Sequence, residues 1–528
     1  MAEAADGGAG LAGSNGNAAD YFIDRHMRGG NGARLAFADP WRRLTYGKLH
    51  ERSAAFAGAL CDAGVAREQR IALLLLDTVD FPIAFWGAIR AGIVPVPINT
   101  LLPPDLVAYI LGDSRAVALV VSAPLWPALR PLLPALPHLR QVIVAAPDGG
   151  AAATAAGETG LPQFISSARP QPQPAACSRD EVAFWLYSSG STGAPKGARH
   201  VHSSLRATAE TYGAQVLQIR PDDVVFSAAK LFFAYGLGNA MTFPMAVGAA
   251  AVLLPERPTP DAVLGVMRRS QATIFAGVPT LYAALLAHPE IGPGAGSDRL
   301  RRCISAGEAL PAHIGERWRE VVGVDILDGI GSTEMLHIFL SNRPDGIRYG
   351  TTGKPVPGYE VRIVDGDGRD VPDGEQGELV VRGASAADGY WNQRDKSRRT
   401  FRGEWTHTGD TYIRDADGYY RYCGRSDDML KVGGIWVSPF EVEEALGADE
   451  AVLEAAVVGH PDDEGLIKPK AFVVLRPAAA ADPAALRERL QMQVKERIGV
   501  WKYPRWVEFV ETLPKTATGK IQRYKLRV

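Results

Sequence analysis

Short strands alternate with helices through much of the first 330 residues, and this alternation limits the fold more than any other feature. A helix is predicted from Tyr46 to Asp62, capped by Thr45 and followed by Gly64. The next predicted elements are a strand at 70–76, a helix at 82–91, a strand at 93–98, a helix at 104–111 and a strand at 116–122. Alternation with short links predicts a parallel α/β sheet with helices on both faces.

The same alternation resumes beyond residue 220. Its candidate strands are residues 224–227, 250–254, 273–277, 302–305 and 325–329. From about Val361 the pattern changes, because Asp-Gly pairs separate short β runs and predict antiparallel hairpins. Residues 145–180 are rich in Ala, Gly, Pro and Ser, and we expect them to form a surface connection rather than a domain linker.

The C-terminal part of the chain predicts a small, separate α+β unit. Ser438 and Glu441 have the spacing of a capping box, with Pro439 at the first helical position. The elements expected there are a helix to about 447, strands at 453–459 and 470–475, a helix at 483–498 capped by Asp482, and a strand at 506–510. The predicted organisation is a disordered tail at 1–18, an N-terminal α/β domain with an antiparallel β subdomain at 19–426, and a mobile C-terminal domain at 427–528.

Composition excludes several classes of protein. The 528 residues carry 57 Lys+Arg against 59 Asp+Glu, so the charge does not favour nucleic acid or an anionic membrane as a partner. The four cysteines lack metal-binding or disulfide spacing, and no apolar run approaches the ~18 residues of a membrane span. The N-terminus lacks a cationic start and an apolar core, so we expect no signal or transit peptide and a cytoplasmic protein.

One stretch carries the strongest chemical signal. Residues 181–197 read EVAFWLYSSGSTGAPKG, an apolar run followed by Gly, Ser and Thr residues and Lys196. Glycine allows close backbone approach, successive amides can cradle an anion, and the hydroxyls and the lysine add donors. The spacing is not that of a Walker A loop, because Lys196 is followed by Gly197. The string therefore indicates a polyphosphate loop of another type, with a flexible turn as the alternative.

This string resembles the phosphate loop of the adenylate-forming enzymes, which include acyl- and aryl-CoA synthetases, peptide-synthetase adenylation domains and luciferases. Four further clusters resemble that family in the right order, and the resemblance covers nearly the whole chain beyond the tail. They are DGIGSTE at 328–334, TGD at 408–410, GRSDD at 424–428 and PKTATGKI at 514–521. Ile330 departs from the family pattern, which usually has Tyr there, so an aliphatic contact with adenine replaces aromatic stacking.

The resemblance implies sites for ATP, Mg²⁺ and coenzyme A. Glu334 and Thr192 are the candidate metal ligands and, with Lys520, the candidate catalytic residues. Lys520 would bridge the substrate carboxylate and the α-phosphate, and Asp427 would be a hinge for the small domain. The cofactor-binding candidates are Ser189, Gly190, Ser191, Thr192, Gly193, Lys196, Ala306, Gly307, Glu308, Asp328, Gly329, Ile330, Thr333, Asp410, Arg425, Gly433, Gly434 and Lys520.

The acid-binding residues resemble the benzoate-CoA ligase branch of the family. They lie in the segments KLFFAYGLG at 230–238 and MLHIF at 335–339. Aromatic rings beside Ala and Gly suit a narrow slot for a ring. The candidates are Phe233, Ala234, Tyr235, Gly331, His337 and Ile338, with a packed core histidine as the alternative for His337.

The resemblance implies an ATP-dependent aryl-CoA ligase, with benzoate as the first choice of acid. The carboxylate would attack the α-phosphate of ATP to give an acyl-adenylate and pyrophosphate, and a thiol would then displace AMP. Alternatives are ligases for hydroxy- or aminobenzoate, an adenylation enzyme loading a carrier protein, a luciferase-like oxygenase and a non-catalytic nucleotide sensor; Lys520 argues against the last. The expected partners are small molecules, without nucleic acid or membrane. The sequence allows a homodimer without determining the oligomeric state.

Overall fold

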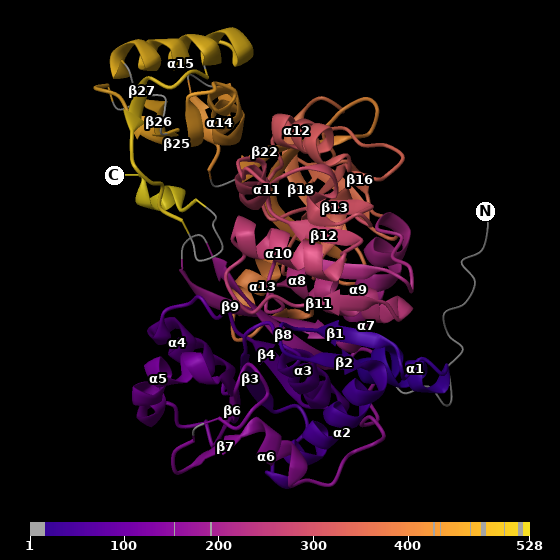
Figure 1. The fold of residues 1–528 in the computed structure, drawn as a ribbon. Coiled ribbons are helices and arrows are strands. Elements are labelled where there is room, and N and C mark those ends of the chain that lie inside the picture. The colour runs from indigo at the N-terminus through magenta and orange to yellow at the C-terminus, as the bar shows by residue number, and fades with distance from the viewer. Residues whose placement is uncertain are drawn as a thin grey trace, which may run out of the picture.

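The computed structural model describes residues 16–152, 154–190, 193–425, 428–432, 435–464, 466–476, 482–500, 502–515 and 521–527. Figure 1 shows the N-terminal segments in indigo and purple in the lower half, and the central segments in magenta above them. The C-terminal unit, in orange and yellow, lies at the top beside β22 and α12.

The lower part of the molecule contains a five-stranded parallel sheet in the order β4-β3-β5-β6-β7. Its strands are β3 (Arg70–Leu74), β4 (Val94–Pro97), β5 (Ala118–Ser122), β6 (Gln141–Ala145) and β7 (Glu158–Gly160). The associated helices are α1 (Arg25–Arg28), α2 (Tyr46–Asp62), α3 (Asp80–Arg90), α4 (Pro104–Ser114), α5 (Trp126–Leu129) and α6 (Leu161–Ser166). This confirms the predicted parallel α/β sheet. The expected surface connection at 145–180 contributes β7 and α6, which contains the buried residue Phe164.

A nine-stranded sheet forms the centre of the chain, in the order β16-β15-β14-β13-β12-β10-β11-β1-β2. The strands are β1 (Leu35–Ala38), β2 (Arg43–Thr45), β10 (Val224–Ser227), β11 (Ala250–Val252), β12 (Ile274–Gly277), β13 (Arg302–Ser305), β14 (Ile326–Gly331), β15 (Ile338–Ser341) and β16 (Lys354–Pro355). The run from β1 to β14 is parallel, while β2, β15 and β16 pair antiparallel at the edges. All five candidate strands beyond residue 220 therefore lie in one sheet.

Helices and short helical segments accompany the central sheet. The α-helices are α7 (His202–Thr208), α8 (Ala234–Leu237), α9 (Phe243–Val247), α10 (Pro260–Ser270), α11 (Pro279–Leu286), α12 (Ala312–Val322) and α13 (Arg394–Thr400). Segments Asp20–Asp24, Ala209–Val216 and Gly238–Thr242 are π-helical. Short 3₁₀ segments are Ala123–Leu125, Arg130–Ala135, Pro293–Gly296 and Arg523–Lys525.

The glycine-rich segment is part of a hairpin, where the sequence predicted a strand followed by a loop. Strands β8 (Val182–Gly190) and β9 (Gly193–Val201) pair antiparallel, and β19 (Gly389–Tyr390) joins the other edge of β9. Ser188 pairs with Lys196, and Gly190 pairs with Gly193. Gly and Pro are depleted in strands, so local propensity hid β9, which is stabilised by its pairing with β8.

The Asp-Gly pairs lie in the connections between strands of a five-stranded antiparallel sheet, as predicted. Its strands are β17 (Glu360–Val364), β18 (Gln376–Arg382), β20 (Phe401–Arg402), β21 (Trp405–Arg414) and β22 (Tyr420–Arg425). Gly418, in the turn between β21 and β22, has a φ of 79°. Glycine takes this conformation without steric cost, which explains the hairpin signal there.

The C-terminal unit has its own sheet and core. Its elements are β23 (Leu430–Val432), β24 (Ile435–Val437), α14 (Pro439–Gly447), β25 (Val452–Pro461), β26 (Ile467–Leu475), α15 (Pro483–Ile498) and β27 (Trp506–Phe509). Ser438 accepts a hydrogen bond from the Glu441 amide at 3.1 Å, and Asp482 caps α15. The Glu441 carboxylate instead accepts two hydrogen bonds from Lys502, so the predicted capping box is made on its serine side.

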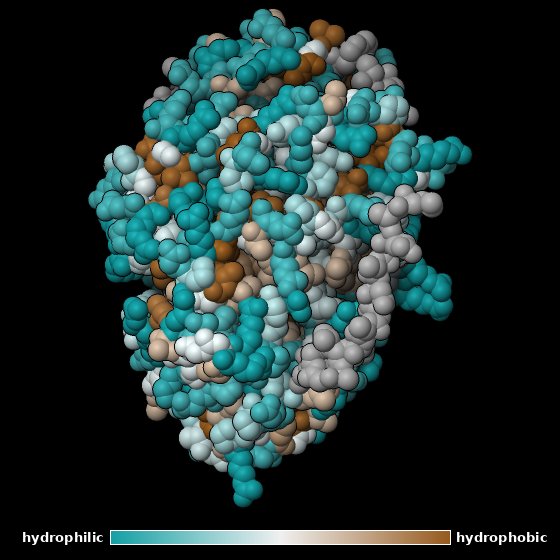
Figure 2. All heavy atoms as spheres, turned by 90° about the vertical axis from the view of Figure 1, so that its right-hand side faces the viewer, coloured by the Kyte–Doolittle hydropathy of each residue, from teal (hydrophilic) through white to brown (hydrophobic). Residues whose placement is uncertain are grey.

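Two expectations about the exterior can be compared with the structure. Asn17 is buried and its amide donates to the Ile89 carbonyl at 2.8 Å, so a tail extending to residue 18 is wrong at its C-terminal end. Residues 1–15 lie outside the described part of the chain. Among the described residues, no helix is long and apolar enough to cross a bilayer. Figure 2 shows a largely hydrophilic face on which hydrophobic residues form small, separate patches.

Candidate active site

The predicted site residues gather where neighbouring parallel strands end. Ser305, the last residue of β13, pairs with Asp328 in β14, so the segments that follow lie side by side. Ala306, Gly307 and Glu308 come directly after β13, while 328–331 form the end of β14. The aromatic segment 233–235 follows β10 in the same sheet. Open α/β sheets bind ligands beyond the carboxyl ends of their strands, so this edge is the candidate site.

Tyr235 fastens the aromatic segment to the strand ends. Its hydroxyl lies 3.1 Å from both the Gly277 and Ile304 carbonyl oxygens, to which it donates. Burial raises the pKa of Tyr235 well above its ordinary value, so the hydroxyl keeps its proton. Tyr235 and its neighbours Phe233 and Ala234 are half-buried. They can therefore form one wall of a narrow slot.

His337 packs behind this wall as a neutral ring. Its Nε2 lies 3.3 Å from the Tyr235 carbonyl, and burial lowers its pKa to about 3. The rings of Tyr212, Tyr235 and Phe243 surround it at centroid distances of 4.5–5.7 Å. His337 is 3% exposed, so it packs in the core as the alternative interpretation of this residue expected. This packing does not depend on any contact with a substrate.

Two other slot candidates also lie against His337. A Cβ at Gly331 would come within 2.4 Å of the His337 carbonyl, so this position requires glycine. Ile338 is buried at the start of β15. The structure thus brings all six acid-binding candidates to one region, through β14, β15 and the segment after β10.

Asp328 is a buried carboxyl group with one oxygen unused. Its Oδ1 has no hydrogen-bond partner among the described groups, and burial raises its pKa well above the ordinary value. Gly329 and Ile330 follow it in β14, where Gly329 packs against Ile338. A buried polar atom without a partner is costly, which suits a site that a ligand's hydrogen-bonding group completes.

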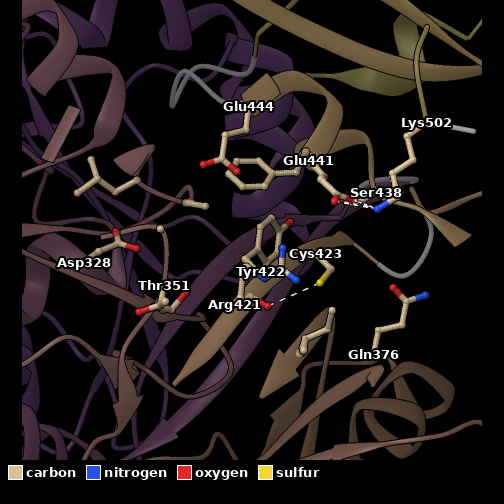
Figure 3. A pocket seen from close by; sticks show the side chains of 16 residues that line it. Asp328, Thr351, Gln376, Arg421, Tyr422, Cys423, Ser438, Glu441, Glu444 and Lys502 are labelled. Atoms are coloured by element: carbon tan, nitrogen blue, oxygen red, sulfur yellow. Dashed lines mark hydrogen bonds and ion pairs between the residues drawn. The ribbon is translucent and has the colours of Figure 1, made fainter. Parts of the chain in front are cut away.

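Asp328 borders a cavity of about 90 Å³ between the large and small parts of the chain. Figure 3 shows Tyr422 and Arg421 of β22 on one side, and Glu441 and Glu444 of α14 on another. The volume is below the ~300 Å³ at which small-molecule pockets begin. The cavity by itself is therefore too small for a whole small-molecule ligand, and its lining comes from both parts of the chain.

Asp410 and Arg425 face each other across β21 and β22. Their backbones pair in register, and Arg425 Nη1 lies 3.1 Å from Asp410 Oδ1 and 3.0 Å from the Thr408 carbonyl. Gly409 has a φ of 71°, and a Cβ there would lie 2.8 Å from the Arg425 guanidinium. Glycine is needed both for the conformation and for the arginine. A carboxylate held this way can accept hydrogen bonds from two adjacent hydroxyls.

Lys196, Glu334 and Tyr390 form the charged centre of the site. The Tyr390 hydroxyl donates to Glu334 Oε1 at 2.6 Å and accepts from Lys196 Nζ at 3.1 Å. Lys196 Nζ also lies 3.7 Å from Glu334 Oε1 and 4.4 Å from the centre of the Tyr390 ring. A carboxylate is thus held beside a cation near the turn end of the glycine-rich hairpin.

His200 fixes the backbone next to this centre. Its Nε2 lies 2.8 Å from the Thr333 carbonyl, and burial lowers its pKa to about 4, so the ring is neutral and donates. His200 and Tyr390 were not predicted from sequence. Tyr390 is 56 residues from Glu334, and neither position belongs to a recognised spacing. Only the pairing of β9 with β8 and β19 brings them to the site.

Two family models match this chain. The AMP-binding enzyme family matches residues 24–391, and the AMP-binding enzyme C-terminal domain matches residues 441–520. The chain belongs to the AMP-binding enzyme family. This confirms the resemblance inferred from the glycine-rich string and the four clusters that follow it.

Individual members of the family are similar along almost the whole chain. A 4-hydroxybenzoate--CoA/benzoate--CoA ligase of Rhodopseudomonas palustris is 54% identical, covering 97% of this chain and 94% of the relative. A benzoate--CoA ligase of Thauera aromatica is also 54% identical, covering 97% and 95%. The crystal structure of a benzoate CoA ligase from Burkholderia xenovorans LB400 matches with a TM-score of 0.89 and 50% identity, covering 97% of this chain and all of that one.

Several predicted residues of this AMP-binding enzyme lie outside the described part of the chain, and three others are described only in their backbone. The backbone of Ser189, Gly190 and Gly193 lies in the hairpin strands. The predicted residues outside the described part of the chain are Ser191, Thr192, Asp427, Gly433, Gly434 and Lys520. Their roles stay predictions.

Proposed function

We propose that this AMP-binding enzyme is an ATP- and Mg²⁺-dependent aryl-CoA ligase with benzoate as its first substrate. The observation that carries the proposal is the position of the aromatic segment 233–235. It lies at the same sheet edge as 306–308 and 328–331, fastened by Tyr235 to the carboxyl ends of β12 and β13. A ring bound there would direct its carboxylate along the strand ends toward the nucleotide.

Several described groups suit the parts of ATP. The unpartnered Asp328 oxygen would accept from the adenine amino group, with Ile330 and residues 306–308 beside the base. Asp410 and Arg425 would hold the ribose hydroxyls. Lys196 would contact the phosphates, together with Ser191 and Thr192 of the glycine-rich string. Small residues and backbone amides allow close approach to anions.

The reaction would proceed in two steps that need no covalent bond to the protein. A carboxylate oxygen of the acid attacks the α-phosphorus, the bond to the β-phosphate oxygen breaks, and pyrophosphate leaves. The CoA thiol then loses its proton and attacks the acyl carbonyl, and AMP leaves as the thioester forms. Lys520 would stabilise the charge that gathers on the α-phosphate in the first step.

Glu334 suits the Mg²⁺ that normally accompanies ATP. Mg²⁺ binds through one or two carboxylates plus substrate phosphates rather than an all-protein cage. Among the described residues, no group of three or more His, Cys, Asp or Glu side chains could hold a metal alone, which fits that mode. Mg²⁺ would supply charge neutralisation on the phosphates, and Thr192 would be its second protein ligand.

Replacing Tyr390 with phenylalanine tests how Glu334 is held. We expect kcat/KM for ATP in the adenylation step to fall about tenfold, because a hydrogen bond to a charged group is lost. Pyrophosphate release with benzoate and ATP, measured over a range of Mg²⁺ concentrations, checks this. Tyr419→Phe is the control, since its hydroxyl donates to the Gly346 carbonyl in a distant loop. Equal behaviour of the two variants would contradict a role for Tyr390 in the site.

The small domain would move between the two steps. Asp427 would be the pivot, and Gly433 and Gly434 would line the path of the CoA thiol after rotation. The cavity in Figure 3 supports this proposal, because its lining comes from both sides of the boundary. Rotation about a few residues is a common way to exchange one set of catalytic groups for another.

Other functions differ in the acid or in the fate of the adenylate. Hydroxy- and aminobenzoate are the nearest alternative acids, and a carrier-protein thiol is the nearest alternative acceptor. A luciferase-like oxygenase would consume O₂ on its own adenylate. A panel of acids with ATP, Mg²⁺ and CoA, assayed for AMP and thioester, separates these options. Adenylate without thioester would favour a carrier protein or the oxygenase.

Ala234→Leu tests the aromatic slot. Added volume in a fitted site costs about 1–3 kcal/mol, or roughly 5- to 150-fold in kcat/KM. We expect the variant to lose more activity with 4-hydroxybenzoate than with benzoate, because the longer ring reaches further along the narrowed slot. The measurement is kcat/KM for benzoate, 4-hydroxybenzoate, 2-aminobenzoate and hexanoate on both enzymes. If hexanoate exceeds benzoate on the unmodified enzyme, the aryl assignment is wrong.

A further inference from the structure

A buried aspartate from the lower sheet binds the backbone of the segment that carries the slot. Asp77 follows β3 and is 3% exposed. Its Oδ1 and Oδ2 accept from the Leu231 amide at 3.2 and 3.3 Å, although 154 residues separate the two positions. Leu231 lies in the connection between β10 of the central sheet and α8. Asp77 therefore links the two large sheets at the slot.

The segment held by Asp77 is compact, so movement at one point would pass to the slot wall. The Phe233 amide donates to the Lys230 carbonyl at 3.0 Å, and the Leu237 amide donates to the Phe233 carbonyl at 2.8 Å. A Cβ at Gly236 would lie 2.0 Å from the Lys230 carbonyl, which shows how tightly the chain folds back. Ala234 lies within this turn.

The segment has a further hydrogen-bonded anchor on each side of Leu231, whose side chain is buried in the core. Lys230 Nζ donates to the Glu256 carbonyl at 2.7 Å and to the Leu254 carbonyl, which places it beyond β11. At the other end, Tyr235 is fastened to β12 and β13. Leu231 lies between these two ties, where a hydrogen bond to a carboxylate is stronger than one between neutral groups.

We propose that Asp77 is a positioning residue for the aromatic acid, which fixes the slot segment 230–235 without contacting the substrate. The inference rests on the proposed aryl-CoA ligase function and adds a residue that none of the motifs contains. Burial raises the pKa of Asp77 to about 6, while Lys230 and the Leu231 amide oppose that rise. Asp77 is thus largely ionised at pH 7.5, as an acceptor for the amide should be.

A second buried aspartate, Asp223, provides a matched control. The slot segment follows the carboxyl end of β10, and Asp223 lies at the amino end of that strand. Asp223 precedes β10, is 4% exposed, and accepts from the Arg220 amide and the Thr273 hydroxyl at 2.7 Å each. It also pairs with Arg301. Asp223 holds the amino end of β10, away from the slot. Its loss should lower stability without changing which acid is preferred.

The test compares Asp77→Leu, Asp77→Asn and Asp223→Asn in the full-length enzyme. We expect Asp77→Leu to lower kcat/KM for benzoate about tenfold or more. A small misplacement of the bound acid slows the reaction, even when the changed residue lies away from the reacting atoms. The ratio of kcat/KM for benzoate over hexanoate should fall, while KM for ATP stays unchanged. Asp77→Asn should stay within about threefold of the unmodified enzyme, since its amide oxygen accepts the same hydrogen bond. Asp223→Asn should lower the melting temperature and leave the ratio unchanged.

The outcomes separate this inference from the proposed function. If the unmodified enzyme activates no aromatic acid, the proposed function fails. If it does, and Asp77→Leu keeps the benzoate-to-hexanoate ratio, Asp77 does not position the slot. Equal losses for both acids together with a raised KM for ATP would indicate a general folding role and overturn the inference. Asp77→Ala, which removes the acceptor without adding volume, replaces Asp77→Leu if that variant does not fold.

Discussion

Replacing Lys520 with alanine should slow adenylation by about 100-fold or more and leave the second half-reaction nearly unchanged. Removing one preorganised donor to developing anionic charge typically has an effect of about this size. The first step gathers negative charge on the α-phosphate, and a lysine there would act as a charge-assisted donor. Thioester formation from a finished adenylate needs no such bridge between carboxylate and phosphate.

The chain around Lys520 suits this role. Residues Lys515 and Ile521 form an antiparallel bridge, and the Gln522 amide donates to the Pro514 carbonyl at 2.8 Å. Both contacts lie C-terminal to β27 and join the residues on either side of positions 516–520. With the proposed rotation of the small domain, Lys520 would enter and leave the site.

Two assays on the Lys520→Ala variant test whether Lys520 acts in adenylation alone. Pyrophosphate release from benzoate and ATP reports the first step, and conversion of supplied benzoyl-adenylate with CoA reports the second. Lys515→Ala is the matched control, since Lys515 lies at the base of the same segment and pairs with Glu454 at 2.6 Å. Equal damage to both steps in Lys520→Ala, or a comparable loss in Lys515→Ala, would contradict the assignment of Lys520 to adenylation.

Local signals in the sequence predicted the elements that local chemistry controls. Thr45, Ser438 and Asp482 each accept a hydrogen bond from a backbone amide in the first turn of a helix, as their positions indicated. The strands 224–227 and 302–305 also have the predicted bounds. Caps and short apolar runs are interactions between near neighbours, so sequence alone determines them well.

Pairing between distant segments escaped prediction for the opposite reason. Strand β9 contains Gly193, Pro195 and Gly197, and it exists because β8 and β19 provide hydrogen-bonding partners. Asn17 is held by the Ile89 carbonyl, 72 residues away, although its neighbours in sequence read as a tail. Neither contact leaves a periodic signal, because both partners are chosen by the fold as a whole.

The candidate site shows the same division. Glu334, Asp410 and Arg425 were predicted as site residues from motifs, and the structure places Glu334 beside Lys196 and Asp410 beside Arg425. The residue that holds Glu334 could not be predicted in this way, because a tyrosine donating to a carboxylate has no characteristic spacing. Tyr390 reaches the site only through the short strand β19. Motifs therefore supplied the candidate binding residues, whereas the residue that contacts Glu334 became visible only in the fold.

Replacing Glu334 with glutamine should lower the adenylation rate by about 100-fold or more, because the proposed charged oxygen ligand of Mg²⁺ would be lost, and with it the ion's stabilisation of transition-state charge. The glutamine amide keeps the size of the side chain, and its oxygen can still accept a hydrogen bond from the Tyr390 hydroxyl. That hydroxyl lies 2.6 Å from Glu334 Oε1 in the unmodified enzyme. What changes is the negative charge, which would attract Mg²⁺ and which faces Lys196 at 3.7 Å. The loss should therefore be specific to the metal-dependent step.

The measurement is pyrophosphate release at several Mg²⁺ concentrations, followed by thioester formation from supplied adenylate and CoA. Raising Mg²⁺ should restore part of the first rate in Glu334→Gln, since weaker binding is offset by mass action, and the second rate should change little. Glu378→Gln is the control: Glu378 pairs with His407 at 2.9 Å in the antiparallel sheet, and its loss should leave the Mg²⁺ dependence unaltered. A Glu334→Gln enzyme with an unchanged Mg²⁺ requirement would show that this carboxylate is not the metal ligand, and Thr192 with the phosphates would then have to hold the ion without it.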